Sequence, residues 1–332
     1  MINAQTTFTV FLIGLLFRIA PDGFAASPWY EEAKKEGIVV WYTSDNIDEA
    51  KPFIDAFSKK YQGVMVVLNR QGTASLVTKM VAERRIGRSD NADVLSTTSE
   101  HLELMRSEIP DLFQKYTSPE HPPEAGGYYS AQYFTIRTIA YNTRLVPPNE
   151  VPRRWTDLLA ERWKGKAAIN LNTYQWIYAM LDFFGEPKGM EFLKRFAAQN
   201  PRPGRGTTLM AQQWLGGGEV EIAVPFNHDG IDRLRERGSP VDWTRLDDPN
   251  YATTNVIAIL GKVQHPNAAR LFVDFALSRE GQTLKAKLGK AVVRRDVAMK
   301  YRIDLKKIRF TGEQARTEAA RYQKLMLDIF SK

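Results

Sequence analysis

The sequence predicts an α/β protein of two domains, each built on a mainly parallel sheet with helices on its faces. Three strand–helix units follow one another in the first third of the chain, which favours a parallel sheet with helical crossovers. The same kind of unit returns after a proline-rich segment at residues 146–154. A length of 332 residues is sufficient for two domains of about 150 residues each.

The composition is typical of a globular protein, with 43% hydrophobic and 25% charged residues. The absence of cysteine excludes disulfides, thiolate metal sites and a cysteine nucleophile. The formal charge of +8 is uneven, because residues 285–332 carry 14 Lys or Arg against 5 Asp or Glu. This basic segment fits either a solvated helical face or a surface for an acidic partner. No nucleic-acid-binding motif accompanies it, so we do not expect nucleic acid as a partner.

The N-terminus has the features of a secretory signal peptide. Residues 8–17 form an apolar run that is shorter than the roughly 20 residues of a membrane-spanning helix. A small-x-small pattern at 23–25 suits cleavage before Ala26. We therefore expect residues 1–25 to direct export to the periplasm, although no basic residue precedes the apolar run.

The first part of the chain predicts three strand–turn–helix units after a short helix at 30–36. The β-branched and aromatic run IVVWY marks the first strand, and apolar residues at helical spacing follow each strand. Because parallel strands end at the same sheet edge, the polar turns after them should lie together. The predicted strands are 38–42, 64–68 and 92–95, and the helices carry apolar residues from about 50, 76 and 102.

The second part begins with a strand at 128–141 that leads into the proline-rich segment, as expected of a crossing between domains. Within residues 219–238, alternating apolar residues run into a polar turn, where Asp229 can cap a helix that Gly238 ends. Further strands are predicted at 167–170 and 253–260, and further helices at 172–184, 188–198, 210–215, 266–276, 281–288 and 313–330.

Polar residues at the ends of strands are the candidates for a binding site. Hydroxyls and free N–H groups at helix starts suit carboxylate or phosphate groups, and Arg70 can add a bidentate contact. Each residue taken singly also fits a simple helix cap or turn. The candidates are Ser44, Asp45, Arg70, Gly72, Thr73, Thr97, Thr98, Asn172, Thr173, Tyr174, Asn227, His228 and Asp229.

Asp45 and Asp229 leave three interpretations open. They can repel an anion, orient a hydroxyl or amine of the ligand, or contribute oxygen ligands to a hard cation. The chain has four histidines and no HExxH, GxSxG, GxGxxG or phosphate-loop pattern, so we expect neither an enzyme nor a cofactor. A secreted hydrolase with His228 as its base remains the alternative from another class.

Several segments resemble the bacterial extracellular solute-binding proteins of ABC importers, specifically the type II class that includes ferric-iron-binding proteins. These segments are EEAKKEGIVVWYTS at 31–44, ADVL at 92–95, TIAYNT at 138–143, PRRWTDLL at 152–159, WKGKAAI at 163–169 and HPNAARLFVDFALSREGQ at 265–282. The resemblance implies two α/β lobes joined by hinge strands, with a ligand held between them and closure by hinge bending. It also implies a monomer that delivers a small solute to a membrane permease.

The resemblance further implies that the chain returns to the first lobe after building the second. The expected divisions are a signal peptide at 1–25, the first lobe at 26–138, the second lobe at 139–228, its end and the hinge at 229–252, the return to the first lobe at 253–300 and a basic helical tail at 301–332.

The ferric-iron members of this class carry two adjacent tyrosines where this chain has Asp229 and Gly230. Their N-terminal histidine and glutamate ligands also have no counterpart near Ser44 or at residues 70–73. We therefore expect a small polar, anionic solute, such as an organic acid or a phosphate- or phosphonate-type compound. Ferric iron held by other oxygen ligands, among them Asp45 and Asp229, is the alternative.

Overall fold

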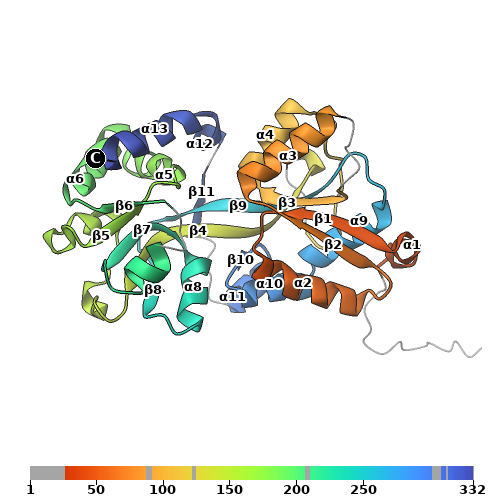
Figure 1. The fold of residues 1–332 in the computed structure, drawn as a ribbon, viewed down its shortest axis with the longest axis horizontal. Coiled ribbons are helices and arrows are strands. Elements are labelled where there is room, and N and C mark those ends of the chain that lie inside the picture. The colour runs from red at the N-terminus through yellow and green to blue at the C-terminus, as the bar shows by residue number, and fades with distance from the viewer. Residues whose placement is uncertain are drawn as a thin grey trace, which may run out of the picture.

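The computed structural model describes residues 27–86, 92–121, 125–205, 210–300, 308–311 and 313–331. These residues form two α/β lobes on one continuous sheet of 11 strands (Figure 1). The predicted signal peptide lies outside the described ranges, as do residues 301–307 of the tail.

The first lobe starts with three parallel strands and the helices that follow them. Its elements are α1 (Tyr30–Glu36), β1 (Ile38–Thr43), α2 (Ile47–Lys60), β2 (Met65–Arg70), α3 (Thr73–Arg85), β3 (Val94–Thr98) and α4 (Ser99–Glu108). β1 pairs in parallel with both β2 and β3, so the predicted parallel arrangement is confirmed. The turns that follow these strands consequently lie along one edge of the sheet.

β3 extends further than the sequence predicted, because residues 96–98 belong to the strand and not to a polar turn. Ser96 is buried, and its Oγ accepts hydrogen bonds from Trp41 Nε1 at 2.9 Å and from Gln132 Nε2 at 3.1 Å. These partners satisfy the hydroxyl inside the sheet, so a polar residue is tolerated where its type alone predicted a loop.

The long strand β4 (Ser130–Asn142) connects the two lobes. Its first part pairs in antiparallel fashion with β9 (Asn250–Ile259), and its second part with β7 (Ile222–Asn227) and β8 (Val241–Trp243). Figure 1 shows β4 and β9 running together across the middle of the molecule. These two strands form the hinge, and the turn η1 (Ala125–Gly127) precedes them.

The second lobe is centred on β5 (Ala167–Asn170), which pairs in parallel with β6 (Arg202–Gly204) and β7. Trp176 anchors its core, with ring centroids 6.3 Å from Trp155 and 6.0 Å from Phe196. Its remaining elements are η2 (Pro148–Glu150), η3 (Trp155–Leu159), η4 (Glu161–Trp163), β5 (Ala167–Asn170), α5 (Gln175–Phe184), α6 (Glu186–Ala198), β6 (Arg202–Gly204), the π-helical turn η5 (Met210–Leu215) and α8 (His228–Glu236).

After β9 the chain returns to the first lobe. It forms α9 (Pro266–Leu277), α10 (Arg279–Lys287), β10 (Ala291–Val292) and α11 (Arg295–Lys300). α9 is almost entirely buried, and Phe272 on it packs 5.1 Å from Trp41 of β1 and 5.5 Å from Phe53 of α2. This aromatic cluster fixes β1 and α2, whose connecting turn reaches the cleft.

The C-terminal segment then crosses to the second lobe, where Figure 1 places the C-terminus. β11 (Ile308–Phe310) pairs with β9, and α12 (Glu313–Thr317) leads into α13 (Ala319–Phe330). α13 buries Tyr322, Met326 and Phe330 in the core of the second lobe. The described part of the basic tail is thus not helical throughout: a strand paired with β9 precedes two helices, and the last of these packs into the second lobe.

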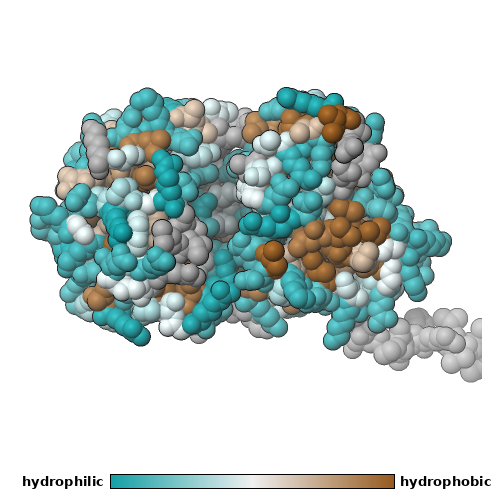
Figure 2. Space-filling view, in the orientation of Figure 1, coloured by the Kyte–Doolittle hydropathy of each residue, from teal (hydrophilic) through white to brown (hydrophobic). Residues whose placement is uncertain are grey.

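The surface of both lobes is largely hydrophilic in the view of Figure 2, with one large apolar area over β1 and β2. β2 ends the strand order of the sheet, and its Met65 and Val67 are 59% and 38% exposed. This apolar area lies on the first lobe and is separate from the cleft described next.

Candidate functional site

A cavity of about 190 Å³ lies between the lobes, and the two hinge strands form its floor. Tyr133, Thr135 and Arg137 alternate along β4 with apolar residues, so all three face the same side of the sheet. Asn255 and Thr253 of β9 pair with Tyr133 and Thr135. Asn255 Nδ2 donates to Thr135 Oγ1 at 2.9 Å, which fixes both side chains at the floor.

The walls of the cavity come from turns and helix starts in both lobes. Six of the thirteen candidates from the sequence lie here, because their strands end at this edge of the sheet. They are Ser44 and Asp45 after β1, Thr73 at the start of α3, Thr98 at the end of β3, Asn227 at the end of β7 and Asp229 in the first turn of α8.

Three candidates from the first lobe lie beside the cavity and not in its lining. Arg70 donates from Nε to the backbone oxygen of Asp45 at 3.3 Å and from a terminal nitrogen to Asn46 Oδ1 at 3.1 Å. Gly72 is the residue that precedes α3, and Thr97 is buried in β3. In this structure, Arg70 supports the turn that carries Asp45 and does not face the cavity.

Four candidates from the second lobe also lie outside the lining. Asn172 donates its backbone N–H to Asn170 Oδ1, and Thr173 is buried at the turn before α5. Tyr174 packs against the core of the second lobe, and burial, followed by the charge of Glu100, raises the pKa of its phenol.

The fourth, His228, is buried under the cavity wall. Its Nδ1 accepts a hydrogen bond from the backbone N–H of Ile136 at 3.3 Å, and its ring lies 5.4 Å from that of Trp243. Burial lowers the pKa of its imidazole, although the charge of Asp229 opposes this shift. The neutral, buried ring therefore has a structural role in holding β4 against α8.

The cavity also contains residues that the sequence did not single out. The polar and apolar alternation of residues 133–137 was a signal for a strand with one polar face, and its polar members were the ones to test. The additional lining residues are Asn46, Glu49, Tyr133, Thr135, Arg137, Arg233, Thr253, Asn255 and Lys290.

Two carboxylates from opposite sides of the cleft share two cations. Lys290 Nζ lies 2.5 Å from Asp229 Oδ2 and 3.0 Å from Glu49 Oε2. An Nη atom of Arg233 lies 2.7 Å from Glu49 Oε1 and 3.3 Å from Asp229 Oδ2. Burial alone would raise the pKa of Asp229, but the charges of Lys290 and Arg233 outweigh it and lower the pKa. The carboxylate therefore stays ionised.

Asp45 is held in a similar way. Tyr133 donates its hydroxyl to Asp45 Oδ1 at 2.6 Å, and Lys285 Nζ lies 3.3 Å from Oδ2. Burial opposes ionisation, but Lys285 and Lys290 outweigh it and lower the pKa of Asp45. Burial and the neighbouring Asp45 and Glu49 raise the pKa of Tyr133 well above its ordinary value, so its hydroxyl remains a neutral donor.

Arg137 differs from these groups, because no described residue forms an ion pair or hydrogen bond with its guanidinium. Its Nε is buried without a partner, as are Asn227 Oδ1 and Thr253 Oγ1 of the same lining. Burial lowers the pKa of Arg137, while Asp229 and Glu100 act in the opposite direction. Arginine keeps its charge under such conditions. The cavity thus presents a cation, a hydroxyl and an amide oxygen that lack partners among the described residues.

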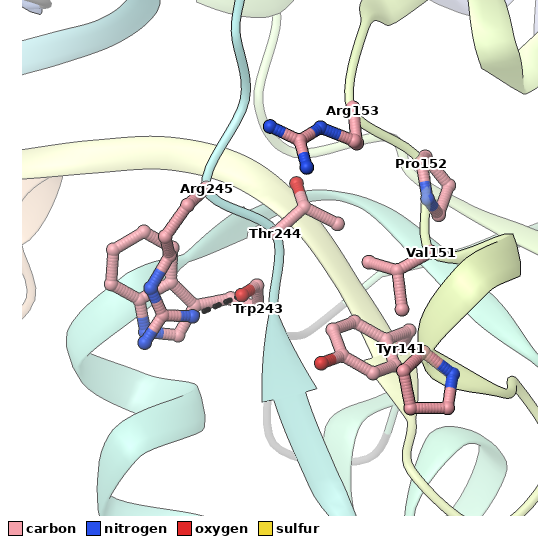
Figure 3. A pocket seen from close by; sticks show the side chains of 8 residues that line it. Tyr141, Val151, Pro152, Arg153, Trp243, Thr244 and Arg245 are labelled. Atoms are coloured by element: carbon pink, nitrogen blue, oxygen red, sulfur yellow. Dashed lines mark hydrogen bonds between the residues drawn. The ribbon is translucent and has the colours of Figure 1, made fainter.

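A larger hollow of about 330 Å³ lies on the outside of the second lobe (Figure 3). Its arginines already have partners: Arg153 bonds to Asp247 at 3.0 Å, and Arg245 bonds to Asp242 at 3.0 Å while it stacks on Trp243. None of its lining side chains carries a buried polar atom without a partner within the described ranges. The interlobe cavity is therefore the better candidate for a ligand site, despite its smaller volume.

The described residues contain no group of three or more His, Asp or Glu side chains arranged to hold a metal ion. Asp45, Glu49 and Asp229 are near one another, but each is in contact with a lysine or arginine. Each of these three carboxylates is therefore paired with a cation of the protein.

The family assignment follows from comparison with known proteins. Residues 97–312, more than half of the chain, match the family model described as bacterial extracellular solute-binding protein. The chain belongs to this family. An uncharacterised protein of Haemophilus influenzae is 27% identical over 276 residues, which cover 77% of this chain and 78% of the relative.

Solved structures share the fold of this solute-binding protein. The periplasmic binding protein AfuA from Actinobacillus pleuropneumoniae, with fructose-6-phosphate bound, is 23% identical and aligns with a TM-score of 0.67 over 89% of this chain and 99% of its own. Iron-bound HitA from Pseudomonas aeruginosa is 21% identical, with a TM-score of 0.66 over 87% and 99%. An ABC-transporter substrate-binding protein from Agrobacterium tumefaciens is 15% identical, with a TM-score of 0.72 over 89% and 96%.

These matches confirm the predicted type II periplasmic-binding-protein fold and the role of a solute-binding protein for an ABC importer. Family members are extracellular or periplasmic binding proteins that deliver small ligands to a permease. In the part of the chain that the structure describes, no helix has the length and hydropathy that a membrane span requires.

Proposed function

We propose that this solute-binding protein captures a small, polar anion in the interlobe cavity and delivers it to its permease without altering it. The observation that carries this proposal is Arg137, a partly buried cation at the cavity floor that lacks any partner in the described residues. A desolvated charge of this kind is costly unless something pairs with it. An anionic ligand supplies that pair.

The arrangement of the other lining residues supports an anion more than ferric iron. The carboxylates that would bind iron are occupied by Lys285, Lys290 and Arg233. The hydroxyl of Thr73 and the starts of α3 and α4, next to Thr73 and Thr98, supply neutral donors at the cavity wall. We also propose that the predicted signal peptide at 1–25 directs export, that the protein acts as a monomer and that nucleic acid is not a partner.

The hydrolase alternative lacks a corresponding arrangement. His228 is buried, neutral and outside the cavity lining. Asp229 beside it is committed to Lys290 and Arg233. Neither side chain is placed to take a proton from a bound substrate.

The test compares Arg137→Gln, Arg137→Lys and Arg153→Gln with the wild-type protein. Native mass spectrometry of gently purified protein identifies a retained solute, and a thermal-shift panel of organic acids, phosphorylated compounds, amines and ferric iron identifies stabilising ligands. Titration calorimetry then measures affinity. We expect Arg137→Gln to weaken anion binding about 10- to 100-fold, because a charge-assisted hydrogen bond is lost.

Arg137→Lys should retain part of the affinity, since lysine keeps the charge but lacks the planar fork that binds two oxygens. Arg153→Gln changes an exposed arginine of the outer hollow and should leave affinity unchanged. Equal anion affinity in wild type and Arg137→Gln, or stabilisation by ferric iron alone, would overturn the proposal.

A further inference from the structure

The charges around the cavity can be counted from their contacts. Three carboxylates face it or support its wall, and each contacts cations within 3.3 Å. Four cations line the cavity or contact these carboxylates; three of them are used in the contacts, and the fourth, Arg137, is not. The carboxylates are Asp45, Glu49 and Asp229, and the paired cations are Lys285, Lys290 and Arg233.

The paired groups hold their charges in the absence of a ligand. The pKa values of Asp45 and Asp229 are lowered, because the charges of the lysines outweigh burial. The pKa of Lys290 is raised, because Asp229, Glu49 and Asp45 outweigh the effect of burial. Both lysines also lie over the face of Tyr133, at 5.0 and 4.8 Å from the ring centroid. The charges of the three carboxylates and the three paired cations therefore sum to zero. Arg137 adds one positive charge that is not paired.

A ligand with one negative charge balances this surplus, whereas a second negative charge would lack a partner in a partly buried site. Glu100 is a further acid whose charge acts on the site. Glu100 lies outside the lining, accepts a hydrogen bond from Thr311 and acts on Arg137 through its charge. Its negative charge repels a dianion about twice as strongly as a monoanion.

The uncharged lining residues indicate what surrounds the anionic group of the ligand. All are hydroxyl- or amide-bearing, and no aliphatic side chain lines the cavity. A volume of 190 Å³ is smaller than the roughly 300–1,000 Å³ of sites for drug-sized ligands. These residues are Ser44, Asn46, Thr73, Thr98, Tyr133, Thr135, Asn227, Thr253 and Asn255.

We propose that the ligand is a small hydroxylated monocarboxylate, with its carboxylate on Arg137 and its hydroxyls on the threonine and asparagine side chains. This inference rests on the proposed anion-binding function and specifies the substrate class. A carboxylate carries one negative charge at neutral pH, whereas a phosphate monoester carries about 1.5 to 2. The charge count therefore distinguishes a sugar acid from a sugar phosphate.

The first experiment uses the full mature protein with D-gluconate, D-glycerate, glucose 6-phosphate, citrate and glucose as probes in titration calorimetry at fixed ionic strength. We expect gluconate or glycerate to bind at least about tenfold more tightly than glucose 6-phosphate, citrate or glucose at pH 7.5, the ratio expected for one unpaired charge in such a site. Tighter binding of glucose 6-phosphate or citrate overturns the inference. If that binding is lost in Arg137→Gln, the proposed anion-binding function still stands.

The pH dependence gives a second readout. Any residual affinity for glucose 6-phosphate should rise between pH 7.5 and 5.5, because its phosphate gains a proton near pH 6 and becomes a monoanion. Gluconate affinity should change less than that of glucose 6-phosphate over this range, since the shifts of Asp45, Asp229, Lys290 and Arg233 all favour their charged forms. Burial lowers the pKa of the nearby His101 and His228, which favours their neutral forms. Phosphate affinity that falls on acidification contradicts a monoanion site.

A charge variant tests the count directly. Glu49→Gln removes one negative charge but keeps an oxygen that can accept from Lys290 and Arg233. It should shift the affinity ratio of glucose 6-phosphate to gluconate about tenfold or more toward the phosphate. Asp48→Asn is the matched control, because Asp48 lies on the same helix, is exposed and pairs with Arg237 at 3.1 Å.

An unchanged ratio in Glu49→Gln, or an equal shift in Asp48→Asn, overturns the charge count. Circular dichroism establishes that each variant is folded, and the wild-type panel alone decides the matter if Glu49→Gln does not fold. Failure of every anion in the panel, together with binding of ferric iron, overturns the proposed function itself and not only the choice of monocarboxylate.

Discussion

At the scale of one residue, Arg137 illustrates how a proposed binding site can lower the stability of the ligand-free protein. A partly buried guanidinium whose Nε has no partner among the described residues is unfavourable in the ligand-free protein. We expect Arg137→Met to leave the ligand-free protein as stable as wild type, or more stable by up to about 1 kcal/mol, which is about 2 °C in Tm. The stabilisation by an anionic ligand should disappear.

Thermal unfolding with and without ligand measures both quantities. A variant that is several degrees less stable without ligand would show that Arg137 has a structural partner, contrary to the present description.

Asp229 should behave in the opposite way, because it pairs with two buried cations. We expect Asp229→Asn to destabilise the protein by about 3 kcal/mol at pH 7, since Lys290 and Arg233 lose a charged partner. The folded-state pKa of Asp229 is lowered, so its stabilising contribution is present above the unfolded value of about 4 and is lost as pH falls.

The difference in stability between wild type and Asp229→Asn should therefore shrink below about pH 4. Urea unfolding at pH 7 and in the acid range measures it, with Asp48→Asn as the exposed control. A difference that grows on acidification would contradict the assigned ion pairs.

The lining residues that could be predicted from the sequence are those that lie at or just after the end of a parallel strand. Ser44, Thr73 and Asn227 follow or end parallel strands, and parallel strands share a carboxyl edge. Arg137 and Thr253 lie inside antiparallel strands, where their place depends on pairing between distant segments. A search restricted to turns could not find them.

At the scale of elements, the sequence correctly predicted the strand–helix units and the C-terminal helix but not the partner of that helix. The spacing of apolar residues in α13 predicted a helix. Its position on the second lobe depends on how the chain crosses between the lobes a last time, after it has returned to the first lobe. We expect Phe330→Ala to destabilise the protein by about 3–4 kcal/mol, because Phe330 contacts Trp176 and Phe196 in the core.

Lys324→Ala, on the exposed face of α13, should change stability by no more than about 0.5 kcal/mol. Chemical denaturation of both variants checks this contrast. Equal small effects would mean that α13 is dispensable for the second lobe.

At the scale of the whole molecule, the hinge is a pairing of residues far apart in sequence. Thr135 and Asn255, which are hydrogen-bonded in the floor, are 120 residues apart in the chain. Local patterns carry no information on such a contact, which explains why two lobes were predicted only from the chain length, the proline-rich segment at 146–154 and the resemblance. The proposed residue divisions of the lobes remain predictions.

Ion pairs cross the cleft beside the hinge. Arg233 of α8 pairs with Glu49 of α2, and Arg237 pairs with Asp48. Opening of the cleft must separate these groups, and salt weakens exposed pairs more than buried ones. We expect the radius of gyration of the ligand-free protein to increase between 0.05 and 1 M salt, and that of the ligand-bound protein to stay constant.

Small-angle X-ray scattering measures this change, and Arg237→Gln should reduce it. An equal radius of gyration in all four conditions would contradict closure by hinge bending.

The position of Arg137 on a strand shared by both lobes has a consequence for kinetics. In the hinge opening that we propose, the walls move away from the floor while β4 remains paired with β9, so we expect the cation to stay accessible in the open form. An anion can therefore associate before the lobes close, at a rate set by diffusion and electrostatic attraction. Its residence time is then set by reopening, so sequence changes around the cleft that alter affinity should act mainly on dissociation.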